Sequence, residues 1–181
     1  MNAGDGFNAS ATPIVLVGLM GAGKTTVGRQ LAADFGVEFV DLDEEIERRA
    51  GMSVAELFGR HGELAFRELE ASASHDLAPG PRTVVAVGGG WMANPIARGA
   101  WPAAVTVWLM VSPEEASRRM KSRTGCRPLL DGADTRSVLE RLLAQRLPAY
   151  GQATYTVDTN RLRADQVAAE VARLVGLATV A

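Results

Sequence analysis

Cysteine is nearly absent from this sequence. Cys126 is the only cysteine among 181 residues, so the chain cannot form an internal disulfide. Proteins of oxidising compartments often depend on disulfides, whereas a lone thiol suits a reducing compartment. We therefore expect a cytoplasmic protein.

Long apolar runs and a strong charge of either sign are also missing. No stretch reaches the roughly 18–20 apolar residues that cross a bilayer, so we expect no membrane partner. The net charge of −2 argues against a nucleic-acid partner, which would require a clustered basic excess. The first residues, MNAGDGFNASAT, lack the basic and apolar regions of a signal peptide. We expect residues 1–12 to form a disordered tail.

The sequence does contain enough apolar residues for one core. It is 47% hydrophobic, which suits a single domain over residues 13–181. Short runs rich in valine are typical of buried strands, and they alternate with helical stripes such as Val27, Leu31 and Phe35. This alternation predicts an α/β fold of three layers, with a five-stranded parallel sheet between helices. The predicted strands are IVLVG, EFVDL, TVVAVG, AVTVWLM and TYTVD, at residues 14–18, 38–42, 83–88, 104–110 and 154–158.

A glycine-rich loop follows the first predicted strand and opens a helix. The segment GLMGAGKT, from Gly18 to Thr25, matches the pattern G-x-x-x-x-G-K-[ST]. In this context backbone N–H groups surround phosphate oxygens, and Gly21 and Gly23 supply conformations that other residues resist. We expect a bound triphosphate, with Lys24 at its β- and γ-phosphates and Thr25 beside Mg²⁺. The alternative is a glycine-rich turn that binds nothing.

The loop alone does not identify what receives the phosphate. The Asn-Lys-x-Asp string with which GTPases read guanine is missing, and the third strand runs into glycines rather than an aspartate. Asp41 and Asp43 therefore become the candidates for metal binding and for the base. Extended backbone would place both carboxylates on one face, at the strand end where ligands bind in parallel sheets. The alternative is that Asp43 only caps a helix beginning at Glu44.

Four further segments place polar residues or glycines at element ends. ELAFRELE puts Arg67 and Glu70 on one helix face, which a surface ion pair would explain equally well. VGGGWM puts Gly88–Gly90 at a strand end, where the backbone either approaches a ligand or makes a tight turn. RTGCRPLL contains Arg127 in a predicted loop, and RLPAY puts Arg146 near a helix end.

Taken in order, these segments resemble the shikimate kinase family, within the nucleoside-monophosphate-kinase-like branch of the P-loop enzymes. The resemblance covers about residues 13–174 and rests on GLMGAGKTTVGRQLA, FVDLDEEIERRAGMSVAELF, GELAFRELE, GGG and RPLL. It implies transfer of the γ-phosphoryl group of ATP to the 3-hydroxyl of shikimate, in the pathway to chorismate and aromatic amino acids. It also implies Mg²⁺ as cofactor and a lid over about residues 122–134.

The resemblance assigns a role to each matched position. The residues that bind the nucleotide would be Gly21, Ala22, Gly23, Lys24, Thr25, Thr26 and Arg127, with Thr25 and Asp41 on the Mg²⁺ side. Those at shikimate would be Asp43, Arg67, Glu70, Gly88, Gly89, Gly90 and Arg146, with Val54, Phe58 and Phe66 along the ring. Asp43 would take the hydroxyl proton, while Lys24 and Arg127 would stabilise charge on the transferring group. Arg67 and Arg146 would bind the carboxylate, a task suited to the planar guanidinium.

Two other functions remain open on the sequence. One is a kinase for another small polyol acid such as gluconate, and the other is a non-catalytic protein that only binds nucleotide. The second is disfavoured because a protein without chemistry has no need of Lys24, Asp43 and Arg127 together. Trp91, directly after the glycines, is a candidate to alter the choice of acceptor. We expect a monomer.

Overall fold

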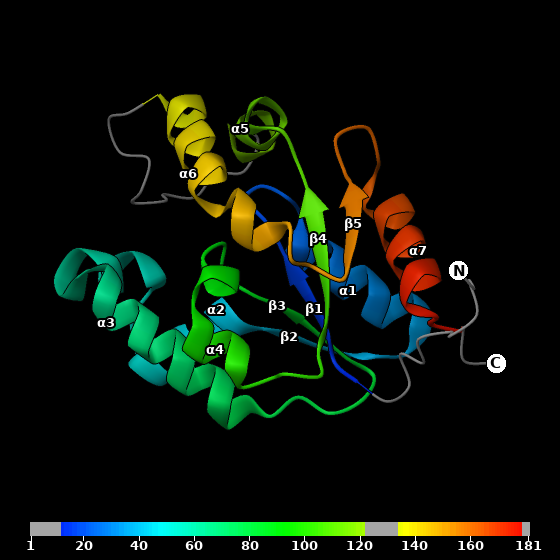
Figure 1. Cartoon of the computed structure of the whole chain (residues 1–181), viewed down its shortest axis with the longest axis horizontal. Helices are drawn as coiled ribbons and strands as arrows, with labels where there is room; N and C mark the ends of the chain where they lie inside the picture. Colours follow the sequence, from blue (N-terminus) through cyan, green and yellow to red (C-terminus); the bar gives the residue numbers. More distant parts are fainter. Residues whose placement is uncertain (1–11, 122–133, 179–181) are drawn as a thin grey trace.

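Five short strands form one parallel sheet in the order β2-β3-β1-β4-β5 (Figure 1). The computed structural model describes residues 12–121 and 134–178. The strands coincide with the predicted runs, and their bounds are β1 Ile14–Val17, β2 Glu38–Asp41, β3 Thr83–Ala86, β4 Val105–Met110 and β5 Tyr155–Asp158. β1 lies in the middle of the sheet, with β3 and β2 on one side and β4 and β5 on the other, so the strand order reverses at β1. Ligands of open α/β sheets bind at such a reversal.

Helices cover both faces of the sheet. In Figure 1, α1 and α7 lie to the right of the strands, while α4 and the end of α6 lie to their left. This arrangement confirms the predicted three-layer α/β fold. The bounds are α1 Lys24–Phe35, α2 Leu42–Ala50, α3 Val54–Leu77, the 3₁₀ helix η1 Trp91–Ala93, α4 Pro95–Gly99, α5 Pro113–Lys121, α6 Thr135–Tyr150 and α7 Ala164–Val175.

The core lies on both sides of the central strand. Ile14, Val15 and Leu16 of β1 have no exposed surface, as expected for a strand between two helical layers. On the α6 side, Trp108 of β4 stacks on Tyr150 with ring centroids 5.5 Å apart. Aromatic pairs of this kind add to the free energy gained by burial. The stack therefore fixes the end of α6 against the sheet.

The helix after the glycine-rich loop ends where the sequence predicts. Val27 and Leu31 of α1 are buried, and Gly36 closes the helix in the left-handed conformation with φ 60°. Gly28 lies directly against the ring of Phe39 on β2, where a side-chain carbon would collide with that ring. The small residue lets α1 pack closely on the sheet.

The region after β2 differs from the expectation. The strand ends at Asp41 and α2 begins at Leu42, so Asp43 lies in the first helical turn and not on extended backbone. Asp41 is the N-cap, since its Oδ1 accepts the amide of Asp43 at 3.1 Å. The proposed cap at Asp43 is therefore wrong. Further on, α3 is kinked at Gly62, which has φ 79° and ψ 177°.

Two predicted segments fall almost entirely outside the described residues. These are the tail over 1–12 and the lid over 122–134, which contains Cys126 and Arg127. Within residues 12–121 and 134–178, no helix has both the length and the apolar character needed to span a bilayer.

Candidate active site

A large hollow opens at the carboxyl ends of the strands. Its volume is ≈ 1320 Å³, and its wall includes the glycine-rich loop, Asp41 and Asp43 after β2, and Gly88–Gly90 after β3. Arg67 of α3 and Arg146 of α6 also line it. The hollow thus brings together predicted nucleotide and acceptor residues from five separate parts of the chain.

The glycine-rich loop has backbone angles that require glycine. Gly21 and Gly23 have φ of 81° and 93°, which confirms the conformation predicted for them. A side-chain carbon at Gly18 would lie 2.6 Å from the Leu109 carbonyl oxygen, so the loop also packs tightly on β4. No side chain caps the start of α1, and its first turn carries no acidic residue. These N–H groups therefore suit an external anion.

Lys24 and Thr25 face the hollow from the first turn of α1. The Lys24 ammonium donates to the carbonyl oxygens of Gly18 and Leu19 at 2.9 and 3.1 Å, so it lies across the loop. The Thr25 hydroxyl donates to Oδ2 of Asp41 at 2.6 Å. Lys24, Thr25 and Asp41 therefore converge at one side of the hollow, as the sequence predicts.

A divalent cation fits this donor set. Mg²⁺ is commonly held by one or two carboxylates together with substrate phosphates. Among the described residues there is no cluster of three or more His, Cys, Asp or Glu that would hold a metal unaided. The Thr25 hydroxyl and the Asp41 carboxylate lie 2.6 Å apart beside the phosphate loop. They therefore match a Mg²⁺ site that is completed by the phosphates of the substrate.

The pKa of Asp43 is strongly shifted. Burial, followed by the nearby charge of Asp41, raises the pKa of Asp43 to about 6, although Lys24 opposes the shift. Its Oδ1 is buried and has no hydrogen-bond partner among the described residues. A side-chain carbon at Gly88 would lie 3.1 Å from this same oxygen. Asp43 therefore presents an unpaired acceptor toward the glycines.

Arg67 is held from one side by carboxylates. Its Nη1 donates to both oxygens of Glu70 at 3.1 and 3.0 Å, and its Nη2 donates to Glu63 at 3.1 Å. Burial raises the pKa of Glu70, while Arg67 and the amide of Asn94 oppose the rise. The guanidinium packs against Gly90, where a side-chain carbon would collide with it. The predicted pair is thus a buried carboxylate that orients an arginine beside the glycine loop.

Arg146 approaches the same loop from α6. A side-chain carbon at Gly89 would lie 2.6 Å from Nη1 of Arg146. This Nη1 is buried and, in the described part of the chain, has no hydrogen-bond partner. Buried donors are almost always paired, so an unpaired one beside a cavity suits a ligand acceptor. Each of the three glycines therefore faces a different charged side chain of the site.

Apolar side chains form one wall of the hollow. Val54, Phe58 and Phe66 of α3 line it, as expected. The rings of Phe58 and Phe66 have centroids 4.7 Å apart, and the Arg67 guanidinium lies 5.3 Å from the Phe66 centroid. A small ligand with a carboxylate and an apolar ring face would match this wall and its charged rim.

Comparison with known proteins identifies the family. The family model for shikimate kinase matches residues 20–175. The chain belongs to the shikimate kinase family. The shikimate kinase of Paramagnetospirillum magneticum is 46% identical over 147 residues, which is 81% of this chain and 75% of the relative. That of Bradyrhizobium diazoefficiens is 42% identical over 161 residues, covering 88% and 77% of the two chains.

A solved structure agrees with these matches. The shikimate kinase from Acinetobacter baumannii in complex with shikimate superposes with a TM-score of 0.85. It is 37% identical, and the match covers 92% of this chain and 94% of that one. As a member of the shikimate kinase family, the chain is an ATP-dependent kinase that phosphorylates an alcohol group.

Several residues of the hollow were not predicted from the sequence. Arg119 of α5 donates to the backbone and hydroxyl of Thr159, and both line the hollow near the loop, as does Asn160. The available signal was that Thr159 and Asn160 directly follow β5, at the same sheet edge as Asp41 and Gly88. Asn94 was also missed. It does not line the hollow, but its amide donates to Glu70 at 3.1 Å.

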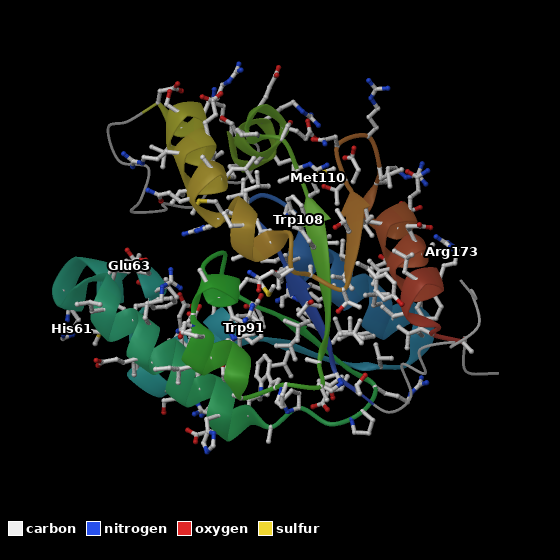
Figure 2. All side chains as sticks on the ribbon, viewed as in Figure 1. His61, Glu63, Trp91, Trp108, Met110 and Arg173 are labelled. Carbon is white, nitrogen blue, oxygen red and sulfur yellow. The ribbon has the colours of Figure 1, made fainter. Side chains whose placement is uncertain are left out.

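Trp91 does not take the place suggested by its position after the glycines. Its side chain has no exposed surface and is absent from the wall of the hollow. The indole N–H donates to the Ser74 hydroxyl at 3.0 Å, and the ring stacks on Trp101. Figure 2 labels Trp91 among the side chains beside the sheet. The 3₁₀ turn that starts at Trp91 directs the side chain into the core, which removes it from acceptor recognition.

Proposed function

We propose that this protein transfers the γ-phosphoryl group of ATP to the 3-hydroxyl of shikimate, giving shikimate 3-phosphate and ADP. The proposal rests on one observation above all. Asp43, Arg67 and Arg146 each face one of three consecutive glycines, and this loop borders the same hollow as the phosphate-binding loop. Such a site places a small anionic alcohol next to a triphosphate.

On the nucleotide side, the amides of Gly21, Ala22 and Gly23 would surround the β-phosphate at the start of α1. Thr26 and Lys24 would continue this contact, and the ammonium would move from the loop carbonyls to the β- and γ-phosphates. Thr25 and Asp41 would hold Mg²⁺, which when bound neutralises charge on the phosphate oxygens. Arg127 keeps its proposed role over the transferring group, although it lies outside the described residues.

On the acceptor side, Arg67 and Arg146 would bind the shikimate carboxylate with charge-assisted hydrogen bonds. Glu70 would keep the Arg67 guanidinium oriented, because two of its hydrogen bonds already fix that group. Gly88, Gly89 and Gly90 would let the ring lie against the backbone. The unpaired Nη1 of Arg146 would gain its missing acceptor in the complex.

Asp43 would receive the proton of the attacking hydroxyl. Its free Oδ1 suits a hydrogen bond from that hydroxyl, and a pKa raised to about 6 makes it a better base than an ordinary aspartate. At neutral pH the Asp43 side chain is still charged in most molecules. Phosphoryl transfer depends mainly on positioning and charge stabilisation, so a moderate base is sufficient.

We further infer a monomeric, cytoplasmic enzyme. The size of one kinase domain favours a monomer, and the single cysteine suits a reducing compartment. Size-exclusion chromatography with light scattering would test the monomer, and a dimer that is required for activity would contradict it.

The deciding experiment is a direct assay of the purified protein with ATP and Mg²⁺. Shikimate and gluconate are supplied in separate reactions, and the phosphorylated acid is identified by mass spectrometry. We expect shikimate 3-phosphate and ADP in equal amounts, with negligible product from gluconate. Phosphorylation of gluconate in preference to shikimate, or ADP formation without a phosphorylated acid, would overturn the proposal.

A further inference from the structure

We propose that Tyr150 is a positioning residue for the acceptor, because its hydroxyl holds the glycine loop in place beside the Arg146 guanidinium. This inference rests on the proposed function and deepens it. Tyr150 is the last residue of α6, one turn beyond Arg146. It does not line the hollow itself and so would act only through its neighbours.

The Tyr150 hydroxyl has a fixed position. It donates to the carbonyl oxygen of Gly89 at 2.5 Å, a contact between residues 61 positions apart. The side chain is 1% exposed, and its ring is held by the stack on Trp108. Packing therefore places the ring, and the hydroxyl is left to hold the loop (the end of α6 lies beside the segment that follows β3 in Figure 1).

Holding the Gly89 carbonyl also fixes the next peptide plane. The peptide unit is planar and the described chain has no cis bonds, so the Gly90 N–H points opposite to the Gly89 carbonyl. Glycine has wide backbone freedom, and three in a row would otherwise sample many conformations. One hydrogen bond from a rigid phenol removes much of that freedom.

Arg146 lies against the same point. The place where Gly89 would carry a side-chain carbon is 2.6 Å from Nη1 of Arg146 and 3.5 Å from the Tyr150 oxygen. The guanidinium thus sits over Gly89 beside the phenol. Burial raises the pKa of Tyr150, and the nearby charge of Arg146 opposes that rise, as expected for close neighbours. The hydroxyl therefore fixes the backbone against which the cation packs, and this cation would meet the carboxylate.

The test replaces Tyr150 by phenylalanine, which keeps the ring and removes one oxygen. The sequence has two tyrosines, and Tyr155→Phe on β5 is a matched control outside the hollow. We expect Tyr150→Phe to raise the KM for shikimate about tenfold, the effect of one lost hydrogen bond. The KM for ATP should stay within about twofold, and Tyr155→Phe should leave both constants within the same range.

A double variant tests whether the effect passes through Arg146. Binding of shikimate is measured by calorimetry with a saturating non-hydrolysable ATP analogue, which also stabilises a weakened variant by binding to its folded state. In an Arg146→Lys background, Tyr150→Phe should weaken shikimate binding much less than in the parent. Equal losses in the two backgrounds would contradict the coupling.

The two proposals fail in different ways. If the unaltered protein does not phosphorylate shikimate, the proposed function is wrong. If it does, and Tyr150→Phe leaves the KM for shikimate unchanged or raises the KM for ATP equally, the role given to Tyr150 is wrong.

Discussion

The hydroxyl of Thr25 donates to Oδ2 of Asp41 at 2.6 Å, which ties the first turn of α1 to the end of β2. The other oxygen of Asp41 caps α2. One carboxylate therefore links the phosphate loop to the helix that carries Asp43. A cation bound at this carboxylate would lie between the phosphate loop and Asp43.

Replacing Asp41 by asparagine should weaken the binding of Mg²⁺ more than the binding of nucleotide. We expect the Mg²⁺ concentration for half-maximal rate to rise about tenfold, since one anionic oxygen is lost from the donor set. Titration of the rate with Mg²⁺ at fixed ATP would measure it. Asp34→Asn, on the exposed side of α1, is the control. An unchanged Mg²⁺ titration would remove Asp41 from the metal site.

Replacing Asp43 by asparagine should abolish most turnover. We expect kcat to fall by about 10²–10⁴-fold, the usual range for loss of a positioned base, while ATP binding persists. Rate measurements and nucleotide titration separate the two effects. Glu44→Gln is the control, because Glu44 is in the same helical turn with a side chain 60% exposed. Retention of most of the parental rate would refute the role of Asp43.

The raised pKa of Asp43 predicts an acid limb in the pH profile. The base must be charged to accept a proton, so kcat/KM for shikimate should fall as pH drops through about 6. A profile from pH 5 to pH 8 in buffers of constant ionic strength would locate the limb. A profile that stays flat down to pH 5 would mean that Asp43 titrates as an ordinary aspartate.

The same pKa predicts that Asp43 lowers stability at neutral pH. A carboxyl whose pKa rises on folding favours the folded state while protonated, and this advantage is lost as pH rises through about 6. Asp43→Asn should therefore be more stable than the parent at pH 8, by up to about 3 kcal/mol for a shift of about two pKa units. The difference should shrink toward pH 4. Urea unfolding at both pH values would measure it, and a destabilised variant at pH 8 would be the contrary result.

Removing the Arg67 guanidinium should act on the acceptor. We expect Arg67→Ala to raise the KM for shikimate about 10–100-fold, because a charge-assisted contact is lost and Glu70 is left buried without its partner. The KM for ATP should change little. Arg60→Ala is the matched control on the same helix, where its side chain is 64% exposed. A selective rise in the KM for ATP would show that the two sites have been assigned the wrong way round.

A methyl group at Gly89 should displace Arg146. The added carbon would lie 2.6 Å from Nη1, closer than such contacts allow, so Gly89→Ala should weaken shikimate binding. Gly59→Ala is the control, since nothing lies within 4 Å of its added carbon. That variant should gain about 0.5–1 kcal/mol of stability, because alanine favours a helix. Calorimetric titration with shikimate and thermal unfolding would test the pair.

The sequence was sufficient to predict the fold, and many of the residues that it assigned to a site line one hollow. Valine-rich runs and helical stripes are local patterns, so all five strands appeared where they were expected. The glycine-rich loop was also local, and its spacing alone predicts the phosphate contact. Asp43 and Arg67 were identified through resemblance, since the sequence alone left a helix cap and a surface ion pair open.

What the sequence could not provide were contacts between distant segments. Asp41 and Asp43 were expected to share an extended face, but a helix starts immediately after the strand and separates their roles. Tyr150 meets Gly89 across 61 residues, which no local pattern reveals. Arg119 was hidden by the abundance of arginine in the chain. The sequence placed Trp91 near the acceptor because it follows the three glycines. The 3₁₀ turn that begins at Trp91 instead directs its side chain into the core.

Much of acceptor recognition is encoded in one insertion of the sheet. The chain between β2 and β3 contains α2 and α3, and these helices supply Asp43, Arg67 and Glu70 together with the apolar wall. The phosphate loop lies before this stretch. Evolution of a new acceptor could therefore begin with changes in this one stretch, while the phosphate loop that holds the donor stays unchanged.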